Sequence, residues 1–112
     1  MKPIDIDSLK PSGGAIAIFN GFEQGISVLF FIVHIFPGHG PKKHRHPYEK
    51  IFILLDREIE AVVDEQPQMI GKDKIAIISA GTWHEFRVCS ENPVSMINIH
   101  PVPKKITEWD PA

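Results

Sequence analysis

The chain has little cysteine and no long apolar run. Cys89 is its single cysteine, so no disulfide can form within one chain, and a reducing compartment is the natural setting. The longest uninterrupted apolar run spans residues 28–33, whereas a transmembrane helix needs roughly 20 such residues. The first residues carry no apolar stretch of the signal-peptide type. We therefore expect a cytoplasmic protein that does not bind membranes.

An excess of charge of one sign is also missing. The 112 residues carry a formal net charge of −2, with acidic and basic side chains mixed along the chain. Without a basic cluster there is no electrostatic footprint for nucleic acid. A hydrophobic share of 43% and a charged share of 23% are ordinary for a folded protein, and this length corresponds to one domain.

Helical periodicity is absent as well, whereas short apolar runs bounded by turn residues recur along the chain. Many short strands of this kind predict an antiparallel sandwich or small barrel. Residues 1–14 read as an N-terminal arm, residues 15–101 as the barrel, and residues 102–112 as a tail whose Trp109 packs against the outside. The predicted strands are residues 15–19, 26–36, 50–55, 58–63, 74–78, 82–89 and 94–100.

Two histidines stand two residues apart ahead of an apolar run, and a third lies near the start of a later strand. Side chains at i and i+2 of an extended strand share a face, so His44 and His46 are expected to point the same way. His84 follows the turn at Gly81. If His84 lies across from the first two, three neutral imidazole nitrogens converge, which is a ligand set for a divalent transition metal.

The spacing around these histidines resembles the two sequence motifs of the cupin superfamily. Gly38 lies six positions before His44, as in the first motif, and the run from Gly81 to His84 is similar to the second. The resemblance covers residues 26–101. It implies an all-β, antiparallel double-stranded β-helix, or jelly-roll barrel. It also implies a divalent metal held by the three histidines, either iron, zinc, nickel, copper or manganese.

The first motif departs from the family's pattern at its fourth ligand. Aligned through the apolar run that follows, the family's glutamate falls on Lys50, with Glu49 beside it, and the family's turn glycine falls on Arg57. Alternation along the strand puts Lys50 on the face of His46 and turns Glu49 away, unless a bulge at Pro47 reverses this. Two arrangements are therefore open. Either Glu49 is a fourth ligand, or three histidines leave positions open for water or substrate, which the alternation favours.

Side chains on the face of the ligands are candidates for the cavity wall. We expect the ammonium of Lys50 to reach the mouth of the barrel, where it can hold an anionic substrate. His39 lies on a loop rich in Gly and Pro and is expected to be exposed, while His34 and His100 are expected to be structural. Cys89 faces away from the ligands, which argues against a catalytic thiol. The expected contacts of a small-molecule ligand are Tyr48, Lys50, Phe52, Phe86, Val88 and Met96.

Three functions are consistent with this pattern. The first is a metal-dependent enzyme acting on a small organic molecule, since cupins with three histidines are similar to dioxygenases that use ferrous iron. The second is a non-catalytic module that binds a sugar or other metabolite. The third is a sugar isomerase or epimerase, against which the apolar Phe86 and Val88 argue. We expect a homodimer, because residues 15–19 and 26–36 offer more apolar surface than one small barrel hides.

Overall fold

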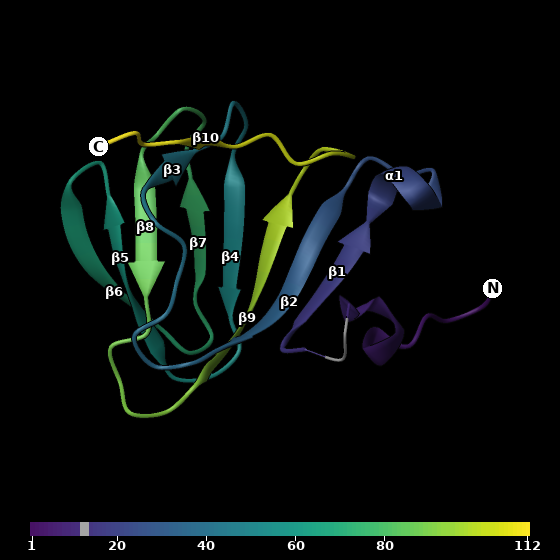
Figure 1. Ribbon diagram of the computed structural model, residues 1–112, viewed down its shortest axis with the longest axis horizontal. Helices are drawn as coiled ribbons and strands as arrows, with labels where there is room; N and C mark the ends of the chain where they lie inside the picture. The colour runs from purple at the N-terminus through teal and green to yellow at the C-terminus, as the bar shows by residue number, and fades with distance from the viewer. Residues whose placement is uncertain (12–13) are drawn as a thin grey trace.

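Two five-stranded antiparallel sheets face each other (Figure 1). The structure is a computed structural model that describes residues 1–11 and 14–112. Positions 12 and 13, part of the predicted N-terminal arm, lie outside the described residues. The arrangement of the strands confirms the predicted all-β jelly-roll fold.

The sheets are built from strands that are distant in the sequence. The first has the order β1-β2-β9-β4-β7 and the second the order β10-β3-β8-β5-β6. The strands of the first sheet are β1 Ile16–Asn20, β2 Leu29–Ile35, β9 Val94–His100, β4 Lys50–Leu54 and β7 Ile75–Ile78. The strands of the second sheet are β10 Glu108–Trp109, β3 His44–Arg45, β8 His84–Arg87, β5 Glu58–Val63 and β6 Gln66–Gly71.

The described residues include two short helical turns, η1 Ile6–Leu9 and α1 Gly21–Gln24. The second of these follows directly on β1. The side chain of Asn20 caps it by accepting a hydrogen bond from the backbone N–H of Phe22. In the described part of the chain, no helix is long and apolar enough to cross a membrane.

The alternation of the strands divides each one between the inside of the barrel and its outside. Every second residue of β9 is buried, and β4 and β8 behave alike. At one end of the barrel the inward residues are apolar, as with Leu54 and Met96. At the other end they are polar, as with Lys50 and His100. The apolar core comprises Val33, Phe52, Leu54, Ile59, Ala61, Ile70, Ile78, Phe86, Val88, Val94 and Met96.

Three strands were not predicted from the sequence. β3 and β10 have two residues each, which is too short for any periodicity, and they pair with each other. β6 is polar, contains Pro67 and lies at the edge of its sheet, where a missing backbone N–H is tolerated. The C-terminal tail, expected to pack on the outside, therefore adds β10 to the second sheet (Figure 1).

The loop before β3 is held against β8 by backbone contacts. The N–H of Gly38 donates to the carbonyl of Val88 at 2.9 Å, and the N–H of Val88 donates to the carbonyl of His39 at 3.1 Å. Gly40 has a φ of +154°, and a Cβ there would lie 1.9 Å from the carbonyl oxygen of Phe86. This close approach requires glycine and fixes the path of the chain toward His44.

Replacing Gly40 with alanine is expected to lower the free energy of unfolding by about 3 kcal/mol, because the backbone of β8 must move to admit the methyl group. Chemical denaturation measures the change. Gly71→Ala is the matched control, since a Cβ at Gly71 meets nothing within 4 Å, and it should change stability by less than about 1 kcal/mol. Equal effects of the two substitutions would contradict the close approach.

Candidate metal centre and cavity

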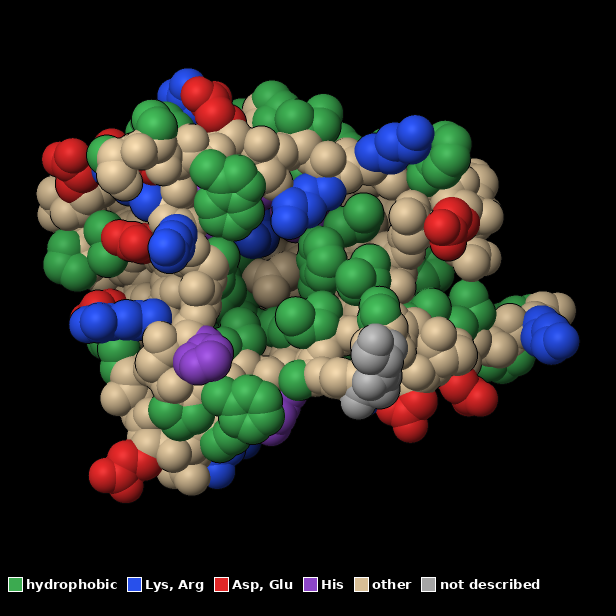
Figure 2. Space-filling view, viewed as in Figure 1, with side chains coloured by type: hydrophobic (Ala, Val, Ile, Leu, Met, Phe, Trp, Pro, Cys, Tyr) green, Lys and Arg blue, Asp and Glu red, His purple; other side chains and the backbone are tan. Residues whose placement is uncertain are grey.

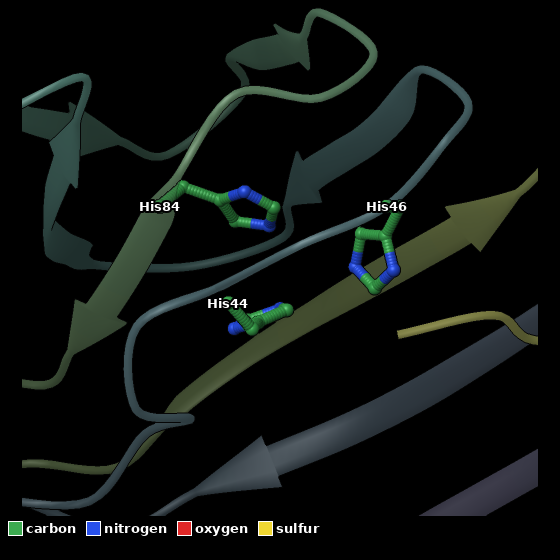
Figure 3. Close-up of side chains that lie close together, drawn as sticks. All are labelled: His44, His46 and His84. Atoms are coloured by element: carbon green, nitrogen blue, oxygen red, sulfur yellow. The ribbon is translucent and has the colours of Figure 1, made fainter. Parts of the chain in front are cut away.

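Three histidines from two distant segments meet inside the polar end of the barrel (Figure 3). His44 in β3 pairs directly with His84 in β8, so their rings lie side by side with centroids 4.3 Å apart. His46 follows two residues later, and its ring centroid is 4.9 Å from that of His44 and 5.4 Å from that of His84. One nitrogen from each ring lies within 4.8 Å of the others. This is the convergence that the spacing of the histidines predicts.

Backbone carbonyls fix the tautomer of each of these rings. Nδ1 of His44 lies 2.6 Å from the carbonyl oxygen of Lys42, and Nδ1 of His84 lies 2.9 Å from that of Thr82. A carbonyl oxygen only accepts, so Nδ1 carries the proton and Nε2 carries a lone pair. The Nε2 atom of His84 is buried without a hydrogen-bond partner, and such an acceptor is costly unless an occupant satisfies it.

His46 has the same arrangement with a partner from the far end of the chain. Its Nδ1 donates to the carbonyl of Ile106 at 2.7 Å, and its Nε2 is likewise buried without a partner. Backbone hydrogen bonds of this kind orient the metal-binding histidines of known sites. The donor set therefore fits a divalent transition metal with three imidazole ligands.

Burial keeps these imidazoles neutral. It lowers the pKa of His44 to about 3 and that of His84 to about 4, and it also lowers the pKa of His46. The nearby Lys50 lowers all three further. A metal ligand must be deprotonated, so the three rings are in the binding form at neutral pH.

The structure decides between Glu49 and Lys50. Glu49 is exposed and lies outside the cluster, so the structure does not bring it together with the three histidines. Lys50 points inward as the alternation of β4 requires. The expected position of its ammonium at the mouth is wrong, because Lys50 is only 5% exposed and Nζ lies 4.7 Å from the centre of the Phe52 ring. Burial lowers the pKa of Lys50 to about 7.

A fourth imidazole, which the sequence predicts to be structural, lies beside the cluster. His100 is 1% exposed, and its ring centroid is 4.8 Å from that of His46. Its Nδ1 lies 2.5 Å from the hydroxyl of Tyr48. The available signal was the alternation of β9, which puts His100 on the same inner face as Met96.

A cavity of about 380 Å³ opens beside the histidines. Of the predicted ligand contacts, Lys50 and Phe86 line it, whereas Phe52, Val88 and Met96 belong to the apolar core and Tyr48 lies behind His100. His34 and His39, both exposed, lie at its outer part. Figure 2 shows a hollow in this face surrounded mainly by hydrophobic side chains, with Lys or Arg side chains at its upper side.

The C-terminal tail closes one side of the centre. Glu108 pairs with Arg45 through two hydrogen bonds of 2.8 and 3.0 Å. The ring of Trp109 lies 4.9 Å from that of His44 and lines the cavity. Together with the carbonyl of Ile106, these contacts make the tail part of the site.

The sequence matches a known protein family. The cupin domain family matches residues 31–100, which is more than half of the chain. This protein belongs to the cupin family. No curated protein matches the sequence.

Solved structures with a similar fold include oxalate decarboxylases. An oxalate decarboxylase from Lactobacillus farciminis, in a formate complex, is 16% identical, with a TM-score of 0.74 over 84% of this chain and 30% of that one. An oxalate decarboxylase from Bacillus subtilis with Mn(II) centres is 13% identical, with a TM-score of 0.72 over 84% of this chain and 27% of that one. The protein BH2720 from Bacillus halodurans is 17% identical, with a TM-score of 0.65 over 71% of this chain and 66% of that one. At these identities the likeness shows the fold, and this cupin spans less than a third of the length of the two decarboxylases.

The neutral histidines make the stability of the metal-free cupin depend on pH. The unfolded chain binds protons below a pH of about 6.5, whereas in the folded protein the pKa of His44 and that of His100 are each about 3. The free energy of unfolding should therefore fall between pH 6.5 and pH 4, by up to about 1.4 kcal/mol per pH unit for each buried histidine. Urea denaturation at pH 7, 6 and 5, in the presence of a chelator, measures this slope. Stability that is flat from pH 7 to 5 would contradict the burial of neutral rings.

Proposed function

We propose that this cupin binds one divalent transition metal through the Nε2 atoms of His44, His46 and His84 and uses it in a metal-assisted reaction on a small organic molecule. The observation that carries the proposal is the set of three Nδ1–carbonyl hydrogen bonds, which leaves three lone pairs facing a common space. Three ligands leave coordination positions open for water or substrate.

The metal supplies Lewis acidity when bound and, if it is iron or another redox-active ion, it supports reactions with dioxygen. The protein's own residues bind and orient the substrate. The apolar wall excludes water from the reacting groups, and the tail residue Trp109 covers the ring of His44. Iron, zinc, nickel, copper and manganese all accept imidazole ligands. The Mn(II) centres of the Bacillus subtilis oxalate decarboxylase support a metal in this fold.

A second candidate is a binding module that works without metal. The observation that favours it is the buried Lys50, which stands where the family's carboxylate ligand would lie and whose positive charge repels a divalent ion. A sugar isomerase is less well supported. Among the described residues no carboxylate lines the cavity, so acid–base catalysis would depend on Lys50 and the histidines alone.

Metal analysis separates these candidates. Untagged protein, reconstituted and then desalted, is expected to retain about one equivalent of a transition metal. His84→Ala should weaken binding by tenfold or more, because it removes one of three ligands. Lys50→Met should strengthen binding, because it removes a repelling charge.

The outcomes of this experiment differ for the two candidates. Less than about a tenth of an equivalent in the wild-type protein, for every metal tried, would remove the metal centre. A thermal shift with a small ligand that survives a chelator would then support the binding module. Retention of metal by His84→Ala at wild-type affinity would place the ion elsewhere.

We also propose that the outer face of the first sheet is the interface of a homodimer. On β7, Ile75 is 67% exposed and Ile77 is 68% exposed. The registers of β4, β9 and β2 continue the row with half-buried side chains: Phe30, Ile32, Ile51, Ile53, Ile97 and Ile99. These outward positions carry no charge, so the face complements a second copy of itself across a twofold axis.

Light scattering coupled to size exclusion should give a mass twice the 12.6 kDa of the chain at micromolar concentration. Ile77→Lys should produce a monomer with an unchanged fold, because the twofold axis would bring two buried ammonium groups into the interface. Met69→Lys, at an exposed position on the other sheet, is the control and should remain dimeric. A monomeric wild-type protein would contradict the proposal.

A further inference from the structure

The cavity carries basic and hydrogen-bond-donating side chains without an acidic counterpart. Its wall includes Lys50, Lys105 and several histidines, and no Asp or Glu of the described chain lines it. None of the ion pairs formed by the described residues includes Lys50. Nζ of Lys50 lies 5.9 Å from the centre of the Phe86 ring, and both side chains line the cavity beside the histidines. A bound metal would add two positive charges to this region.

His100 differs from the three ligand histidines in its tautomer. The hydroxyl oxygen of Tyr48 accepts a hydrogen bond from the backbone N–H of Ile106 at 3.3 Å. The proton of this hydroxyl is then free to go to Nδ1 of His100, 2.5 Å away. We assign Nδ1 as the acceptor of this hydrogen bond, which leaves the ring proton on Nε2 of His100. His100 lines the cavity as a donor, whereas the three ligand rings present lone pairs.

Lys50 lies next to His100 on the inner face of the first sheet. The antiparallel register pairs Ile51 with Ile99, so the residues at the next position, Lys50 and His100, stand opposite each other. Both line the cavity. Lys50 donates hydrogen bonds whether or not it is protonated, so the two side chains form a pair of adjacent donors.

Asn98 adds a third polar group on the same strand. It lies two residues before His100, lines the cavity and is 6% exposed. Its Oδ1 is buried without a hydrogen-bond partner. Such an acceptor needs a hydrogen-bond donor, from water or from a bound molecule. Rotation about the Cβ–Cγ bond lets Asn98 present either its oxygen or its amino group.

The rest of the cavity wall is apolar. It suits an aromatic or aliphatic body rather than a sugar, because it offers few partners for hydroxyl groups. Its volume of about 380 Å³ exceeds what a two-carbon acid fills. The apolar wall is formed by Ala15, Ile16, Phe31, Val33, Ile35, Phe36, Phe86 and Trp109.

We propose that the cavity binds a small organic carboxylate with an apolar body. The carboxylate accepts hydrogen bonds from Nζ of Lys50 and Nε2–H of His100, and the body packs on Phe31, Val33 and Phe86. The inference rests on the proposed function for its biological meaning, because it names the substrate class of the same site. The geometric support for the inference comes from the two donors, Lys50 and His100, and from the apolar wall. The inference can therefore be tested without metal.

Calorimetry with two probes of one shape tests the charge preference. Phenylacetate carries the carboxylate, and phenylacetamide is its neutral counterpart. Metal-free wild-type protein is expected to bind phenylacetate at least about tenfold more tightly than phenylacetamide, because charge-assisted hydrogen bonds exceed neutral ones. The same titration on metal-loaded protein shows whether the metal adds affinity.

Two variants and one control locate the carboxylate. Lys50→Met should weaken phenylacetate binding by about tenfold and leave phenylacetamide binding within about twofold. Tyr48→Phe should weaken phenylacetate binding by roughly threefold, because the tautomer of His100 is no longer fixed. Lys72→Met, at an exposed turn away from the cavity, should leave both affinities unchanged.

Nitrogen-15 NMR of the histidine rings supplies a readout that needs no variant to fold. Wild-type protein should show Nδ1–H tautomers for His44, His46 and His84 and an Nε2–H tautomer for His100. An Nδ1–H tautomer at His100 would overturn the donor role. Equal affinity for the two probes, or no binding of phenylacetate at about 10 mM to metal-free and metal-loaded protein, would overturn the substrate class. Failure of metal analysis with a retained phenylacetate preference would instead remove only the proposed metal centre.

Discussion

Three hydrogen bonds from imidazole Nδ1 atoms to backbone carbonyls orient the three histidine rings at the centre of this protein. They determine at once where each ring points and which nitrogen carries the proton. For His44 and His84 the carbonyl belongs to a residue two positions earlier, so the local conformation of the chain sets the tautomer. For His46 the carbonyl comes from Ile106, so the orientation of that ring depends on the tertiary structure. The direct pairing of β3 with β8 then brings the two segments together.

The alternation of the strands explains why most of this fold follows from the sequence. The predicted strands lie over seven of the observed ones, and the same alternation placed Lys50 inside and Glu49 outside. The alternation could not predict strands that are too short to show any periodicity. β3 and β10 are two residues long, and they form because the tail returns across the barrel to pair with the segment that carries His44.

The alternation also fails to separate the wall of the cavity from the core. Phe52, Val88 and Met96 do face inward, but they lie where the two sheets fill the interior with side chains. His100 faces inward at the other end, where space remains. The position of an inward-facing residue along its strand therefore decides whether it fills the core or lines the cavity. That position depends on the registers between strands. The role of His100 further depends on Tyr48, 52 positions earlier in the chain.

The contact between His46 and Ile106 has a consequence for the order of assembly. The two residues are 60 positions apart, so the ring of His46 is synthesised before the carbonyl that orients it. Until the tail docks, His46 lacks the carbonyl that orients its ring. If the three histidines bind a metal as proposed, the fully oriented set of nitrogens is therefore present only in the finished barrel.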